Sequence, residues 1–170
     1  ENLVSLFNNG RLPLDKESKA IRSLLAERNA IKGKAYRQEV LLWLNDNTGL
    51  LTYSQEITIK RKGFFIADAD KGDIDILAIN HEKKIIYSIE CKNTSQSKVA
   101  YEFHLEIIEY LGQSGKPGLI QKHVNRDQWL QENHGQVVQK LNVDPGFTIL
   151  SVVISNHVLP AAFLRTIPIT

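Results

Sequence analysis

The stretch Gly72-Asp73-Ile74-Asp75-Ile76-Leu77-Ala78-Ile79-Asn80 is followed, after a polar turn at residues 81–84, by a second apolar stretch that ends in Glu90-Cys91-Lys92. The pattern predicts two neighbouring antiparallel β-strands, at residues 74–80 and 84–92. Successive side chains of a strand point to opposite faces of the sheet. Asp73 and Asp75 are therefore expected on one face of the first strand, and Glu90 and Lys92 on one face of the second.

Acidic side chains inside a strand need a partner, because Asp is depleted in strands and a buried, unpaired charge is costly. A divalent cation between Asp75 and Glu90 would be such a partner, since oxygen ligands are those that Mg²⁺ prefers. Lys92 lies two residues beyond Glu90 and points the same way, toward whatever the metal holds. The two strands therefore predict a metal site.

The spacing Asp75-x14-Glu90-x-Lys92 on adjacent strands resembles the PD-(D/E)xK nuclease superfamily, the restriction-endonuclease-like phosphodiesterases. In that family an acid on one strand is followed by (D/E)-x-K on the next. Ile74 stands where the motif's name has proline, as in the Gly-x-Ile-Asp variant of the resolvase-like and restriction-like branches. The resemblance covers about residues 33–155. It implies an α/β fold with an αβββαβ core, in which a mixed central sheet is flanked by helices.

By this resemblance the protein would be a metal-dependent endonuclease that hydrolyses DNA phosphodiester bonds, restriction-like or resolvase-like. Asp75, Glu90 and the backbone carbonyl of Cys91 would bind Mg²⁺ or Mn²⁺, with Asp73 as an alternative ligand. Lys92 would orient or deprotonate the attacking water, or stabilise the charge of the transition state.

Glu39 completes the set of candidate catalytic residues. In the nuclease superfamily the first core helix often carries a glutamate, which here would hold a second metal ion or a metal-bound water. The alternative is a solvated glutamate on the flank of the helix. Cys91 points away from Glu90 and Lys92, so it is expected to be a buried small hydrophobic residue rather than a nucleophile.

The rest of the chain supplies the elements that the core requires. Gly33 is expected to break or bend the first helical region. The expected elements are helices at 16–32 and 34–47, a strand at 51–60, apolar residues at 64–66, a turn at 68–72 formed by Asp68 and Asp70, helices at 99–111 and 125–141, and a strand at 147–155 that is buried on both faces. The single domain 1–170 thus divides into a helical extension, 1–32, and a core, 33–155.

Basic residues lie in two places outside the motif. The turn Lys60-Arg61-Lys62-Gly63 is either a solvated hairpin tip or a phosphate contact. Lys122, His123, Arg126, His134 and Lys140 lie around the last helix, where they are expected at the surface, some of them near nucleic-acid phosphates; their spacing does not suit a zinc site.

Composition sets the remaining expectations. The 170 residues are 42% hydrophobic and 24% charged, which suits one globular domain, and the net charge of +2 does not by itself indicate nucleic acid. A single cysteine, no apolar run long enough to span a membrane and no signal peptide favour a cytoplasmic protein. The chain has no methionine, so it is expected to be a fragment of a longer protein.

Two classes of function remain open. The first is the DNA endonuclease, acting with further domains of the same protein and, if it cuts both strands, as a homodimer or in two passes. The second is a non-catalytic nucleic-acid-binding or scaffolding domain that keeps the nuclease fold. The presence of Asp75, Glu90 and Lys92 together favours the first, since degenerate relatives usually lose one of them.

Overall fold

The computed structural model describes residues 19–94, 100–113 and 115–158. Its centre is a four-stranded sheet in the order β1-β5-β6-β9, formed by β1 (Leu51–Thr52), β5 (Ile76–Asn80), β6 (Ile85–Lys92) and β9 (Thr148–Ser155). The first three strands are antiparallel and β9 runs parallel to β6. The predicted mixed α/β class and the order helix, antiparallel strands, helix, parallel strand are confirmed.

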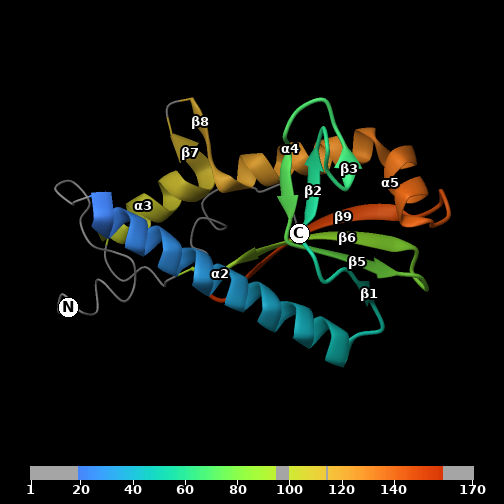
Figure 1. The fold of residues 1–170 in the computed structure, drawn as a ribbon, viewed down its shortest axis with the longest axis horizontal. Helices are drawn as coiled ribbons and strands as arrows, with labels where there is room; N and C mark the ends of the chain where they lie inside the picture. The colour runs from blue at the N-terminus through green and yellow to red at the C-terminus, as the bar shows by residue number, and fades with distance from the viewer. Residues whose placement is uncertain (1–18, 95–99, 114, 159–170) are drawn as a thin grey trace.

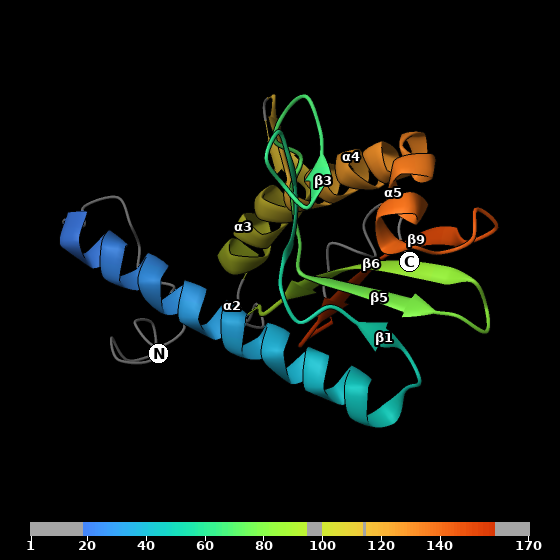
Figure 2. The ribbon, with the colours of Figure 1, turned by 45° about the vertical axis from the view of Figure 1, so that its right-hand side comes forward.

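Helices cover the two faces of this sheet (Figure 1). On one face α2 (Lys19–Asn47) buries Val40, Leu41 and Leu44 against a cluster that includes Ile76 and Cys91. On the other face lie α4 (Leu119–Glu132) and α5 (His134–Leu141), whose apolar side chains pack on the alternate residues of β5 and β6. The remaining helix, α3 (Ala100–Leu111), packs beside α4 (Figure 2).

The motif strand does not run straight. The predicted strand 74–80 divides into β4 (Gly72–Ile74) and β5, with a bend at Asp75, and the predicted strand 51–60 divides into β1 and β2 (Ile57–Lys60). β2 and β4 pair with each other and, with β3 (Phe65–Ile66), form a second sheet. Four residues, 53–56, oppose three residues, 75–77, between the paired segments. This extra residue acts as a bulge, which bends both strands out of the central sheet.

The first helical region is also continuous, contrary to the prediction of two helices at 16–32 and 34–47. Gly33 lies inside α2, which ends at Asn47 as predicted. Thr48 closes the helix, because its backbone N–H and its hydroxyl both donate to the carbonyl of Leu44, at 3.0 and 2.5 Å. One glycine costs an exposed helix only about 1 kcal/mol, which the packing of the C-terminal half on the sheet outweighs.

Gly33 provides a test of this continuity. A methyl group at this position would meet no atom within 4 Å. Gly33→Ala is therefore expected to raise the free energy of unfolding by about 0.5–1 kcal/mol, measured by urea denaturation. The reverse change two residues on, Ala35→Gly, should lower it by a similar amount. A loss of stability in Gly33→Ala would mean that the helix is interrupted there.

The C-terminal half departs from prediction in two respects. The predicted helix 125–141 begins earlier, at Leu119, and is interrupted at Asn133, whose backbone N–H and side-chain amide both donate to the carbonyl of Trp129, at 3.0 and 2.8 Å. Strand β9 matches its predicted extent but is not buried on both faces, since Leu150 is 42% exposed. β9 is an edge strand of the described sheet, and of its residues only Val152 and Ile154 pack against the cluster beneath α2.

The helix predicted at 99–111 and the turn predicted at 68–72 are confirmed where the structure describes their residues. α3 begins at Ala100 and ends at Leu111, and Asp68 and Asp70 form turns by accepting from the backbone N–H groups of Ala69 and Gly72, at 2.9 and 2.8 Å. A small hairpin of β7 (Gly112–Gln113) and β8 (Lys116–Pro117) joins α3 to α4. Most of the predicted helix at 16–32 is described, but its first turn, the lead-in before it and the tail after 158 lie outside the described residues. No helix among the described residues is both long and apolar enough to cross a membrane.

Candidate active site

The register of β5 and β6 brings the two motif carboxylates together. Ile76 pairs with Ile89, so Asp75 at the bend stands opposite Glu90, on the face that α4 covers. The backbone N–H of Cys91 donates to Asp75 Oδ2 at 2.7 Å. Lys92 follows on the same face as Glu90, with its Nζ 2.6 Å from Glu90 Oε1. Asp75, Glu90 and Lys92 thus form one group, as the sequence predicts.

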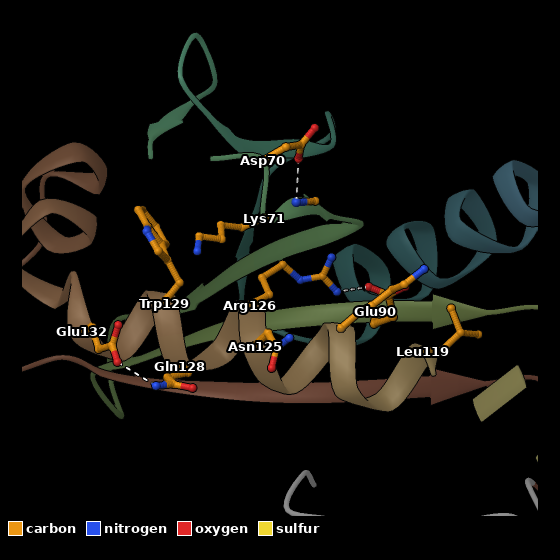
Figure 3. A pocket seen from close by; sticks show the side chains of 11 residues that line it. Asp70, Lys71, Glu90, Leu119, Asn125, Arg126, Gln128, Trp129 and Glu132 are labelled. Atoms are coloured by element: carbon orange, nitrogen blue, oxygen red, sulfur yellow. Dashed lines mark hydrogen bonds and ion pairs between the residues drawn. The ribbon is translucent and has the colours of Figure 1, made fainter. Parts of the chain in front are cut away.

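Glu90 is held by two cations. Besides Lys92, the Nη2 atom of Arg126 on α4 forms an ion pair and hydrogen bond with Oε2 (Figure 3). Burial by itself would raise the pKa of the Glu90 carboxyl, but the positive charges of Arg126 and Lys92 outweigh burial and hold this pKa below its usual value. Glu90 is therefore ionised at neutral pH.

Asp75 has the opposite perturbation. Burial and then the negative charge of Glu90 raise the pKa of the Asp75 carboxyl, and the hydrogen bond from Cys91 and the charge of Lys92 only partly offset them. The bend that presents Asp75 is held from α2, where Arg37 donates from Nε to the Asp75 carbonyl at 2.6 Å and from Nη2 to the Ser54 carbonyl at 2.9 Å. The fold thus keeps two mutually repelling carboxylates side by side.

The donor set can be compared with what a metal requires. Mg²⁺ is usually bound in proteins through one or two carboxylates, and water completes its octahedron. Asp75 and Glu90, with the carbonyl of Cys91, fit this description, and the charge repulsion that raises the pKa of Asp75 is what a cation would relieve. Within the described ranges no group of three or more His, Cys, Asp or Glu side chains could hold a metal ion. A cation held by these residues would therefore take most of its ligands from water.

Two candidate ligands do not join this group. Glu39 is exposed on α2, which packs on the opposite face of the sheet. Its negative charge acts on Tyr36 of the same helix, whose pKa is raised first by burial and then by Cys91 and Glu39. Asp73 lies in the second sheet with an exposed side chain, because the bend at Asp75 breaks the alternation that the sequence suggested. In the described part of the chain no hydrogen bond or ion pair connects either carboxylate with Asp75 or Glu90.

Arg126 and His123 are buried, against the expectation that they lie at the surface. Arg126 is 7% and His123 2% exposed, and Arg126 also donates from Nη1 to the backbone carbonyl of Asp73. Burial and then the charge of Arg126 lower the pKa of His123, so the neutral ring accepts at Nδ1 from Arg126 Nη2, at 3.1 Å. His123, Arg126 and Leu130 are spaced by three and four residues, so they lie on one face of α4. This helical spacing with an apolar residue was the signal in the sequence that could have predicted their burial.

Cys91 is the buried small residue that the sequence predicts. It is 9% exposed within the cluster beneath α2, and burial, followed by the charges of Asp75 and Glu90, raises the pKa of its thiol to about 12. At pH 8 only about one thiol in ten thousand would be ionised, against roughly a quarter for an unperturbed cysteine. Iodoacetamide should therefore label native Cys91 far more slowly than the urea-unfolded chain, as mass spectrometry would measure. Equal labelling rates would contradict the burial of this thiol.

A cleft opens next to Glu90 on the side of α4 (Figure 3). It encloses about 620 Å³ and lies between the turn at residues 70–72 and α4. Arg126 and Trp129 line it from the helix, and Lys71 from the turn. Of the two motif carboxylates, Glu90 lines this hollow, which is large enough for a ligand.

The family of the chain follows from comparison with known proteins. A family model described as anti-phage protein Upx-like matches residues 26–168, which include the whole described core from Ala26 onward and all the candidate site residues. No curated protein and no solved structure matches the chain. The description names defence against bacteriophages and no reaction. The chain belongs to the Upx-like family of anti-phage proteins.

Proposed function

We propose that this protein is a metal-dependent deoxyribonuclease that defends its host by hydrolysing phosphodiester bonds of phage DNA. The observation that carries the proposal is the juxtaposition of Asp75 and Glu90 at the bend between β4 and β5, with Lys92 on Glu90 at 2.6 Å. The resemblance to the PD-(D/E)xK nucleases rests on the same three residues, and membership of an anti-phage family supports the proposal independently.

The chemistry explains why these residue types are needed. Hydrolysis of a phosphodiester is slow because the anionic backbone repels hydroxide and the alkoxide is a poor leaving group. Asp75, Glu90 and the Cys91 carbonyl would hold Mg²⁺ or Mn²⁺, which when bound lowers the pKa of water and neutralises charge in the transition state. The ammonium group of Lys92 faces the same place and would orient the attacking water or stabilise the negative charge that develops on the phosphate.

A second function is favoured by one observation. Both carboxylate oxygens of Glu90 already have cationic partners, Lys92 and Arg126, so a metal ion would have to compete with them. A domain that binds nucleic acid without cutting it would need no such exchange. We rank this alternative second, because Asp75 would then be a carboxylate held at an unfavourable pKa without use.

The test is cleavage of supercoiled plasmid in Mg²⁺, in Mn²⁺ and in EDTA. The wild type should nick the plasmid with either metal and not in EDTA, and Lys92→Ala should be at least about 100-fold slower, since several kcal/mol of transition-state stabilisation are lost. Lys83→Ala, in the exposed turn between β5 and β6, is the matched control and should cut at the wild-type rate. Cleavage that persists in EDTA, or that Lys92→Ala retains, would exclude this mechanism.

A further inference from the structure

The proposed hydrolysis assigns a role to Glu90 and to no other residue that lines the cleft between the turn at 70–72 and α4. A ligand in the cleft would lie beside Glu90, one of the two motif carboxylates (Figure 3). Its volume of about 620 Å³ falls in the range, about 300–1,000 Å³, in which proteins bury small organic ligands. A double helix, whose major groove alone is about 12 Å wide, does not fit in such a space. One nucleotide does.

The side chains of α4 in this cleft offer unused hydrogen-bonding groups. Asn125 accepts with its Oδ1 from Gln121 Nε2 at 2.8 Å, and Gln128 donates with its Nε2 to Glu132 Oε1 at 2.8 Å. For the described residues, the structure records no partner for the amide nitrogen of Asn125 or the amide oxygen of Gln128. These two residues are three positions apart, so they are neighbours on the helix surface. One donor beside one acceptor complements the edge of a nucleobase, which carries the same pair of groups.

One wall of the cleft offers apolar contact to a base. Trp129 lines it with a side chain that is 7% exposed and packed against Phe65, and Leu119 adds an aliphatic contact at one end. Contacts with the core fix the position of the Trp129 ring, so the edge of the ring that faces the cleft is held in one place.

Two lysines of the cleft are placed to contact the phosphates that flank such a base. Lys71 and Lys122 line it, and neither has an ion-pair partner in the part of the chain that is described. Asp70 and Glu132 keep their negative charge while they accept from the N–H of Gly72 and from Gln128, and Glu90 is paired with Arg126 and Lys92. The two lysines are thus the cations available to a phosphate backbone.

We propose that this cleft binds one unpaired nucleotide of the DNA strand, adjacent to the phosphate that is cut. The base contacts the exposed edge of Trp129 and is read by Asn125 and Gln128, while Lys71 and Lys122 contact the flanking phosphates. The substrate is therefore single-stranded DNA, or a duplex site with an extruded or unpaired base, rather than uninterrupted duplex. The inference rests on the proposed function for the position of the cut, but binding itself needs no catalysis.

Binding is measured in EDTA by fluorescence anisotropy, with a labelled single-stranded oligodeoxynucleotide and the duplex of the same sequence. The wild type should bind the single strand at least about tenfold more tightly. Lys71→Ala combined with Lys122→Ala should weaken binding about tenfold and reduce its salt dependence, because two phosphate contacts are lost. The matched control, Lys34→Ala combined with Lys83→Ala at exposed positions on α2 and in the turn between β5 and β6, should change affinity less than about twofold. Preference for the duplex, or the larger effect from the control pair, would overturn the proposal.

Trp129 gives a second readout within the cleft. The chain has two tryptophans, and Trp43 is 59% exposed on α2, away from the cleft. In the Trp43→Phe variant, single-stranded DNA should quench the emission of Trp129, and Asn125→Ala combined with Gln128→Ala should weaken that quenching at equal thermal stability. Quenching without cleavage would overturn the proposed nuclease but leave the cleft as a nucleotide site. Cleavage without quenching would overturn the cleft proposal alone.

Discussion

Replacing Arg126 by methionine is expected to lower the free energy of unfolding by about 3–5 kcal/mol, the cost of leaving a buried charge without its partner. Arg126 is 7% exposed and connects three elements through its guanidinium group, which contacts Glu90 on β6, the carbonyl of Asp73 on β4 and His123 on α4. Methionine keeps much of the aliphatic length and removes all of these hydrogen bonds. Glu90 would keep only Lys92 as a partner.

Urea denaturation measures this loss, and two further variants show its origin. Lys122→Met changes an exposed cation on the same helix and should alter stability by less than about 0.5 kcal/mol. Adding Glu90→Gln to Arg126→Met removes the buried carboxylate that has lost one of its two cations, so the double variant should recover a part of the lost stability. A loss below about 1 kcal/mol in Arg126→Met would mean that Glu90 does not depend on this arginine.

The part of the site that the sequence predicts correctly is local. Alternation along two strands and a short turn between them fix which residues stand opposite each other, and this rule places Asp75 against Glu90 and Lys92 beside it. The last strand was also predicted within one residue, because a run of apolar residues flanked by turn formers has few alternatives.

The incorrect predictions depend on contacts between distant segments. The bend at Asp75 follows from the one extra residue in the segment 53–56, which lies opposite residues 75–77. Neither segment alone shows this difference in length. Asp73 was assigned to the site because that bend was not foreseen. Arg126 was assigned to the surface because charged residues are rarely buried, and only the carboxylate of Glu90, 36 positions away, makes its burial favourable. Gly33 shows the same limit, since tertiary packing overrides a local breaker.

The second large effect is expected from Asp75→Asn, which should reduce metal-dependent cleavage by about 100- to 1,000-fold. The substitution removes one of two carboxylates available to a cation, and metal-assisted catalysis contributes several kcal/mol, with each 1.4 kcal/mol equal to a factor of ten. The amide oxygen of asparagine can still accept the hydrogen bond from the N–H of Cys91, so the bend should be kept. Plasmid nicking in Mg²⁺, compared with the wild type at equal protein concentration, measures the effect.

The same variant should be at least as stable as the wild type at neutral pH. The folded-state pKa of Asp75 is raised, chiefly by burial and by Glu90, so the native protein binds more protons than the unfolded chain between the unfolded and folded pKa values. Stability conferred by protonated Asp75 is therefore lost as pH rises through that window, and the cost of ionising Asp75 is present in full above it. Asn carries no charge and avoids this cost, so its advantage over the wild type should grow with pH from about 4 upward and then become constant.

Glu90→Gln separates this effect from a general loss of charge. The folded-state pKa of Glu90 is lowered despite its burial, because Arg126 and Lys92 favour the carboxylate, so its contribution to stability is present above the unfolded pKa and is lost as pH falls. Glu90→Gln also removes one of the two carboxylates, so it should reduce cleavage as strongly as Asp75→Asn does, yet it should destabilise the protein at neutral pH. Two variants that are equally inactive but differ in the sign of their stability change would identify Asp75 as a carboxylate maintained at a cost to folding. If Asp75→Asn were the less stable of the two, Asp75 would be a structural residue of the bend instead.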